Sequence, residues 1–204
     1  MATLFVSVFL ISFASAVIPG PVLAVAVTKG FQSPRGGFYV ALGHTITDAV
    51  IILLIYYGLS QFFENETVKL WLYILGGVLT IWLGTAIYRS RDKSVTGRTG
   101  ETKQAFLLGI ITTLFNPMFW LWWATAGSMF IMRFSEYGIT GILAFILTIE
   151  LPALIWYSLA GMLTYNTNSY SWGQRFRKWI ISASGVILVG FGLYFIWSGI
   201  TLIV

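Results

Sequence analysis

The stretch FASAVIPGPVLAVAVTKG, residues 13–30, decides how this chain folds. It is apolar almost throughout, but Pro19, Gly20 and Pro21 interrupt it. A proline has no amide N–H to donate and its ring opposes the carbonyl four residues earlier, so two prolines around a glycine predict a break in a long apolar helix. We expect each proline to leave a backbone carbonyl unpaired, and such carbonyls at a helix end attract an ammonium group.

The composition places this helix in a membrane. Of 204 residues, 57% are hydrophobic and 9% are charged, whereas about a quarter of an ordinary soluble domain is charged. A spanning helix needs about 20 mostly apolar residues, because its backbone must be satisfied within the segment. Six segments have that length, at residues 3–27, 38–59, 70–88, 105–132, 138–164 and 180–204. The fold class is therefore an all-α membrane protein with six transmembrane helices.

The N-terminal run up to Ala16 resembles a secretory signal peptide, but no lysine or arginine precedes it and the apolar pattern continues to Val27. We interpret it as the first membrane helix.

The positive charges predict the orientation. Ten of the 12 lysines and arginines, including Lys29 and Arg35, fall in the first, third and fifth loops. Cationic loops stay on the cytoplasmic side, so we expect a multi-pass protein of the cytoplasmic membrane with both termini outside the cell. Lys29 and Arg35 are assigned this topological role alone. No basic stripe is interleaved with aromatic residues, so a nucleic-acid partner is not expected.

The two halves of the chain share a pattern. Gly77-Val78 is followed after seven residues by Gly84, and Gly185-Val186 by Gly192. The fourth segment is also interrupted, at Asn116 and Pro117. We expect Pro117, like the prolines of the first break, to leave a backbone carbonyl unpaired. We therefore predict a three-plus-three inverted repeat with a broken first helix in each unit, at residues 1–89 and 105–204, joined by a cytoplasmic hinge at 90–104. Such repeats build transporters whose substrates bind at the broken helices. The substrate-binding candidates there are Pro19, Gly20, Pro21, Asn116 and Pro117.

Three ionisable side chains lie within predicted membrane segments, where charges are costly and usually functional. His44 and Asp48 are four residues apart and share one face of the second segment, while Glu150 lies near the middle of the fifth. An imidazole beside a carboxylate is a pair that can take up and release a proton. We predict that Asp48, His44 and Glu150 couple proton entry to substrate exit.

Aromatic residues and glycines supply two further predictions. Trp120, Trp122 and Trp123 follow the second break closely, and Trp156 and Tyr157 follow Glu150. An aromatic ring that faces the cavity can bind a substrate ammonium by cation–π attraction, and Trp120 is our candidate for that role. Gly185, Gly192 and Gly199 repeat every seven residues on one helix face. They favour close helix packing, either within the bundle or between two copies in a homodimer.

Taken together, these residues resemble the LysE/RhtB-type family of amino-acid exporters over essentially the whole chain. The resemblance is carried by Pro19-Gly20-Pro21, by Gly43-His44 with Asp48, and by Asn116-Pro117. It implies a six-helix inner-membrane exporter for amino acids or related small amines, driven by protons and without a cofactor. It also implies that Pro19, Gly20, Pro21, Asp48, Asn116 and Pro117 surround the transport path. Many relatives carry a lysine directly after the Asn-Pro pair, where this chain has Met118.

Three other functions compete with amino-acid export as explanations of these residues. A divalent-metal exporter would use His44, Asp48 and Glu150 as ligands, although the chain has no histidine-rich loop to gather metal. A membrane enzyme or electron carrier lacks the usual parts, because there is no cysteine and one histidine. A non-transporting scaffold subunit is the third.

Overall fold

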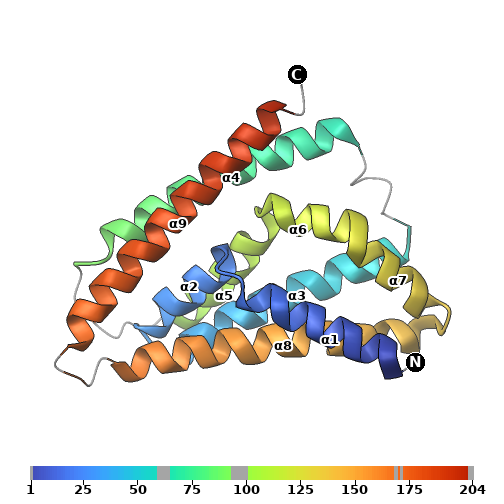
Figure 1. Cartoon of the computed structure of the whole chain (residues 1–204), viewed down its shortest axis with the longest axis horizontal. Coiled ribbons are helices and arrows are strands. Elements are labelled where there is room, and N and C mark those ends of the chain that lie inside the picture. Colours follow the sequence, from blue (N-terminus) through green and yellow to red (C-terminus); the bar gives the residue numbers. More distant parts are fainter. Residues whose placement is uncertain (1, 59–64, 93–100, 168–169, 171, 202–204) are drawn as a thin grey trace.

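The structure is a computed structural model that describes residues 2–58, 65–92, 101–167, 170 and 172–201. Throughout these ranges the regular structure is helical, with no strand (Figure 1). The helices are α1 Ala2–Val17, α2 Pro21–Gly30, α3 Gly36–Tyr56, α4 Glu66–Arg89, α5 Glu101–Leu114, α6 Pro117–Trp122, the π-helix η2 Trp123–Gly127, α7 Ser128–Ser135, α8 Gly138–Asn166 and α9 Gly173–Thr201.

Four of these helices, α3, α4, α8 and α9, are long and apolar enough to cross a membrane. Two bent pairs pass the same test. The first joins α1 to α2 at an angle of 66°, and the second joins α5 to the α6–α7 segment at 58°. Counting each bent pair as one span gives six spans among the described residues, with a break in the first and the fourth.

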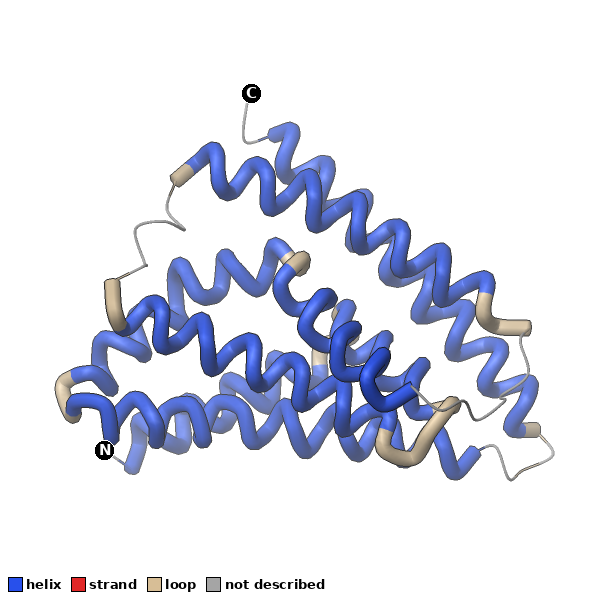
Figure 2. Tube along the Cα trace, turned by 180° about the vertical axis from the view of Figure 1, so that it is seen from behind, coloured by secondary structure: helices blue, strands red, loops and turns tan. Residues whose placement is uncertain are grey.

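The helices form two layers (Figures 1 and 2). Antiparallel α4 and α9 pack along each other's length and form one layer. The other layer is built around α3 and α8, with α1 and α2 against α8 and with α5 against α3. Contacts of α2 with α9 and of α6 with α4 connect the layers. The half-helices next to the two breaks therefore lie where the layers meet.

The repeated glycines explain how α4 and α9 pack. A Cβ added at Gly84 would lie 2.8 Å from the carbonyl oxygen of Gly185, and one added at Gly185 would lie 2.8 Å from that of Gly84. Gly77 and Gly192 face each other in the same way. A Cβ at Gly199 would meet Tyr73 of α4 at 2.9 Å. The glycine series therefore serves packing within the chain, and it gives no support to a homodimer.

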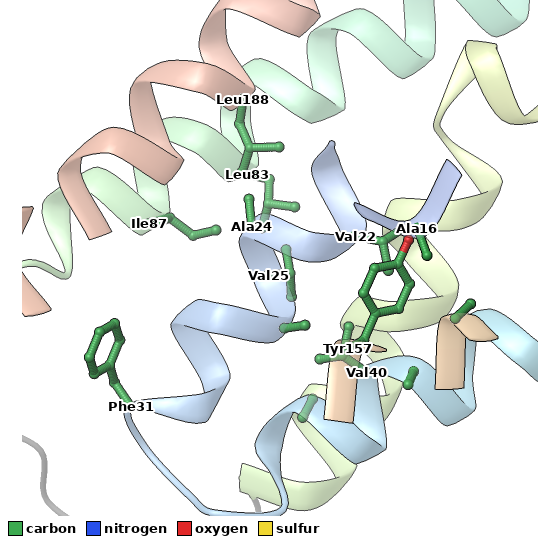
Figure 3. Packing of buried hydrophobic residues seen from close by; sticks show 14 of the residues in the cluster. Ala16, Val22, Ala24, Val25, Phe31, Val40, Leu83, Ile87, Tyr157 and Leu188 are labelled. Atoms are coloured by element: carbon green, nitrogen blue, oxygen red, sulfur yellow. The ribbon is translucent and has the colours of Figure 1, made fainter. Parts of the chain in front are cut away.

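Buried apolar residues hold α2 between the layers. Figure 3 shows Ala24 and Val25 of α2 between Leu83 and Leu188 of the α4–α9 layer and Val40 of α3. A second apolar cluster surrounds Trp123, Phe134 and Phe145 at the other end of the bundle.

Some boundaries differ from the sequence prediction. Helix α5 begins at Glu101 and α9 at Gly173, so both begin before the predicted apolar segments. Polar and basic residues extend these helices by about one turn or more beyond their apolar parts. Residues 93–100, which make up most of the predicted hinge, lie outside the described residues. The π-helix after α6 carries no signal that we recognised in the sequence, and α8 continues through Pro152.

Candidate functional site

The first break leaves backbone groups without partners. Gly20 precedes α2 in an extended conformation (φ −125°, ψ −178°), and no side chain caps this helix N-terminus. The first hydrogen bond of α2 runs from the N–H of Ala24 to the carbonyl of Gly20, at 3.0 Å. Among the described residues, no backbone N–H donates to the carbonyls of Ser15 or Val17, which stand four residues before the two prolines. The break therefore presents a helix C-terminus and a helix N-terminus side by side.

The second break is satisfied internally. The N–H of Asn116 donates to the carbonyl of Thr113 at 3.2 Å. The indole Nε1 of Trp120 donates to the carbonyl of Leu114 at 2.6 Å, and Oδ1 of Asn116 accepts from the N–H of Met118 at 3.1 Å. The expectation that Pro117 leaves the Thr113 carbonyl unpaired was therefore wrong. A tight turn brings the amide just before the proline to that carbonyl, which the sequence rule does not consider.

A cavity of about 350 Å³ lies between the breaks and the middle of α3, α8 and α9. Its described lining is mainly apolar and aromatic, with a few polar groups, and consists of Ser12, Ser15, Ala16, Ile18, Gly20, Pro21, Val22, His44, Asp48, Asn116, Met118, Phe119, Trp122, Trp123, Ile149, Glu150, Ala153, Tyr157, Phe191 and Phe195.

Six of the nine site residues predicted from the sequence line this cavity, namely Gly20, Pro21, Asn116, His44, Asp48 and Glu150. The other three lie elsewhere. Pro19 is exposed next to the cavity. Pro117 faces α4, where a Cβ added at Gly76 would approach its ring at 3.1 Å. Pro117 and Trp120 both line a separate pocket of about 10 Å³. The tryptophans in contact with the main cavity are Trp122 and Trp123.

The three ionisable residues meet at one point of the cavity. His44, Asp48 and Glu150 each offer a ligating atom, and these atoms lie within 4.8 Å of one another. Asp48 is 6% exposed and Glu150 is 4% exposed. Within the described structure, Oδ1 of Asp48 and Oε2 of Glu150 have no hydrogen-bond partner. Nδ1 of His44 lies 3.5 Å from Oδ1 of Asp48 and 3.0 Å from Oγ1 of Thr113.

This arrangement favours the binding of a positive charge. The ligating oxygens of Asp48 and Glu150 lie within 4.8 Å of each other, so the two carboxylates, when both are ionised, repel each other by about 3.5 kcal/mol or more at an effective dielectric constant of about 20. A proton, an ammonium group or a metal ion next to the pair removes this repulsion. With the imidazole, the two carboxylates also form a donor set that a divalent cation accepts.

Sequence reasoning did not assign several of the lining residues to the site. Tyr157 follows Glu150 by seven residues, which places both on one face of α8. That spacing could have identified it. Its side chain is buried, and Figure 3 shows its hydroxyl directed towards Ala16 and Val22 at the first break. Its ring meets that of His44 edge-on at 5.7 Å. Phe191 and Phe195 also line the cavity, but α9 is apolar on most of its faces and gives no sign of which one is used.

A helical chain with up to six membrane spans, broken at two places around a cavity that contains ionisable side chains, defines the class of multi-pass membrane transport proteins. The model of one transporter family, described as LysE type translocator, matches residues 11–199. The chain therefore belongs to the LysE family of amino-acid exporters, and it is a transporter and not an enzyme.

Three relatives illustrate the match. The chain is 27% identical to the putative amino acid efflux protein YcgF of Bacillus subtilis, over 97% of each chain. It is 25% identical to the threonine efflux protein of Escherichia coli K12, over 97% of this chain and the whole of that protein. It is 30% identical to the chemotactic transduction protein ChpE of Pseudomonas aeruginosa, over 63% of this chain and 65% of that protein. No solved structure matches the chain significantly.

Proposed function

We propose that this protein exports an amino acid across the cytoplasmic membrane in exchange for protons, and that the cavity at the helix breaks is its substrate site. Two relatives that align with 97% of the chain are named for amino acid or threonine efflux. The cavity of about 350 Å³ is at the small end of ligand pockets, which favours one amino acid over a peptide.

The single observation that carries the proposal is the open first break. Because nothing caps α2, its N-terminal amides and the positive end of its dipole are available to a carboxylate. The free carbonyls at the end of α1 are suited to an ammonium group. A zwitterionic amino acid carries both groups on one carbon, so it matches two helix ends that face one cavity.

The proton role rests on the acidic pair. Asp48 and Glu150 border the same cavity as the open break. Because the two carboxylates repel, a proton bound there and a substrate ammonium compete for one negative site. Because of this competition, release of the amino acid depends on uptake of a proton at the same site. The same residues are the ligands of the metal-export alternative, which the comparisons with known proteins do not favour.

The packing of the helices supports the inverted repeat. If each unit contributes a broken helix and two whole ones, exchange of the units pairs α1 with α5, α3 with α8 and α4 with α9. The contact of α5 with α3 then has its counterpart in α1 with α8. The contact of α2 with α3 corresponds to α7 with α8, and that of α2 with α9 to α6 with α4. We propose units at 1–89 and 105–204, with the connection between them at 90–104, of which residues 101–104 form the first turn of α5.

The absence of cysteine makes the orientation testable. Single cysteines at Ser33, in the first loop, and at Glu136, before α8, carry no background of native thiols. With both termini outside, a membrane-impermeant maleimide added to intact cells labels the variant at Glu136 and not the one at Ser33. The reverse pattern would overturn the orientation.

The transport test uses purified protein in proteoliposomes, loaded with a panel of labelled amino acids under an imposed pH gradient. We expect at least one amino acid to exchange in response to the gradient, and Asp48→Asn and Glu150→Gln to abolish that response while remaining inserted. Glu66→Gln is the matched control, since it removes an exposed carboxylate at the start of α4. Normal pH-driven exchange by both cavity variants would rule out the proton role. No flux of any amino acid would favour a scaffold, and stabilisation by a divalent metal with metal flux would favour metal export.

A further inference from the structure

The hydroxyl group of Thr113 in α5 has one hydrogen to donate and lies within hydrogen-bond distance of two other groups. Oγ1 lies 2.8 Å from the carbonyl oxygen of Gly109, one turn earlier. It also lies 3.0 Å from Nδ1 of His44, across the contact between α5 and α3. A carbonyl can only accept, so the single hydrogen of Thr113 goes to Gly109. The hydroxyl must then accept from His44, which requires a proton on Nδ1.

The surroundings of the imidazole point to the same tautomer. Oδ1 of Asp48, 3.5 Å from Nδ1, would repel a lone pair there and attracts an N–H. The other titratable groups around His44 are Glu150 and Tyr157, both from α8. On α2, the charged residue is Lys29, whose ammonium group donates to Gln32 and Gln104. With Nδ1 facing Thr113 and Asp48, Nε2 is the nitrogen that remains for a ligand or a proton.

Thr113 also belongs to the second break. Its own carbonyl accepts from the N–H of Asn116, in the turn that ends α5. One residue thus contacts the break through its backbone and His44 through its side chain. A change in the angle between α5 and α6 alters the Thr113 backbone first, and the hydrogen bond to the imidazole with it.

We propose that Thr113 is a positioning residue of the transport site, which holds His44 in its Nδ1–H form and ties the second helix break to the acidic pair. This inference rests on the proposed function for its role in transport, while the state of the imidazole can be measured separately. It adds a mechanical link between the second repeat and Asp48, which lies on the first.

The neighbouring residue supplies a matched control. Thr112 is also buried, and its hydroxyl donates to carbonyls of the same turn, those of Leu108 and Gly109. No hydrogen bond joins it to His44 within the described structure. Thr112→Val and Thr113→Val therefore remove the same kind of local bond from adjacent positions. Thr113→Ser keeps the hydroxyl and should restore what the valine removes.

The first readout is nitrogen NMR of protein labelled with ¹⁵N-histidine, in which the single histidine gives one pair of ring signals. We expect unmodified protein, Thr112→Val and Thr113→Ser to carry the proton on Nδ1. Thr113→Val removes one of the two acceptors that face Nδ1 and leaves Asp48, so it should shift the Nδ1 signal and raise the share of the Nε2–H form above that in unmodified protein. An Nε2–H form in unmodified protein, or signals unchanged by Thr113→Val, would overturn the inference.

The second readout is amino-acid exchange in proteoliposomes. A residue that positions His44 without touching the substrate should affect the maximal rate and not the KM. We expect the maximal rate of Thr113→Val to fall about tenfold, the equivalent of one lost hydrogen bond, and Thr112→Val and Thr113→Ser to stay within twofold. An equal loss in both valine variants would make the role merely structural. If unmodified protein exchanges no amino acid, the proposed function fails, while the NMR comparison still decides whether Thr113 sets the state of His44.

Discussion

Replacement of Gly20 by alanine tests whether this glycine is needed for the fold or for the space that it leaves to the substrate. At Gly20 the backbone angles are open to any residue, and an added Cβ would meet one atom, the carbonyl oxygen of Ile18, at an ordinary 3.8 Å. Neither strain nor packing requires a glycine there. Alanine also reduces the freedom of the unfolded chain, so we expect Gly20→Ala to stabilise the protein by about 0.4 to 1 kcal/mol.

Transport should change in the opposite direction. Gly20 lines the cavity at the open N-terminus of α2, so the methyl group takes space that we assign to the substrate carboxylate. Overpacking of this kind costs about 1 to 3 kcal/mol, which corresponds to about a 5- to 150-fold weaker apparent affinity. The assays are thermal unfolding in detergent and the KM of exchange in proteoliposomes.

Gly190→Ala is the control for Gly20→Ala. A Cβ at Gly190 meets nothing within 4 Å, and this residue of α9 is exposed and is not among the cavity lining. It should gain about 1 kcal/mol of helix stability with an unchanged KM. If Gly20→Ala transports as well as Gly190→Ala, the space beside Gly20 is not used by the substrate and the assignment of the carboxylate site is wrong.

Three further predictions concern stability. Gly84→Ala places a methyl group 2.8 Å from a carbonyl of α9, so it should lower the stability by about 1 to 3 kcal/mol, and an unchanged Tm would contradict the backbone contact. Asn116→Ala removes the cap on the N–H of Met118 and should cost about 0.5 to 2 kcal/mol, whereas Asn116→Asp keeps an acceptor and should unfold near the normal Tm. The hydrogen bond from Lys178 lowers the pKa of exposed Asp92 below its ordinary 3.8. The small contribution of this hydrogen bond to stability is therefore fully present above pH 3.8 and is lost as the pH falls through the lowered pKa of Asp92 in the folded protein. The Tm difference between Asp92→Asn and unmodified protein should then vanish in strong acid.

Much of the candidate site could be predicted because its causes lie within single helices. The four-residue spacing of His44 and Asp48 places them on one face of α3 in any environment. Glu150 could be included because a carboxylate in an apolar helix needs a polar surrounding. Trp120 could not be placed by the same reasoning, since its distance from the break along the chain does not say which way the ring turns. Its indole donates to the carbonyl of Leu114.

By itself, the sequence determined that the chain spans a membrane and that its first and fourth segments break at their prolines. Both follow from the covalent chemistry of the residues, namely apolar side chains in long runs and a ring that removes an amide donor. Only the tertiary structure decided that the first break stays open while the second is closed by Asn116 and Trp120. It also decided that Phe191 and Phe195 line the cavity and that the hydroxyl of Thr113 lies within hydrogen-bond distance of His44. These depend on which groups from distant parts of the chain come within hydrogen-bond or van der Waals distance, and no local pattern records that.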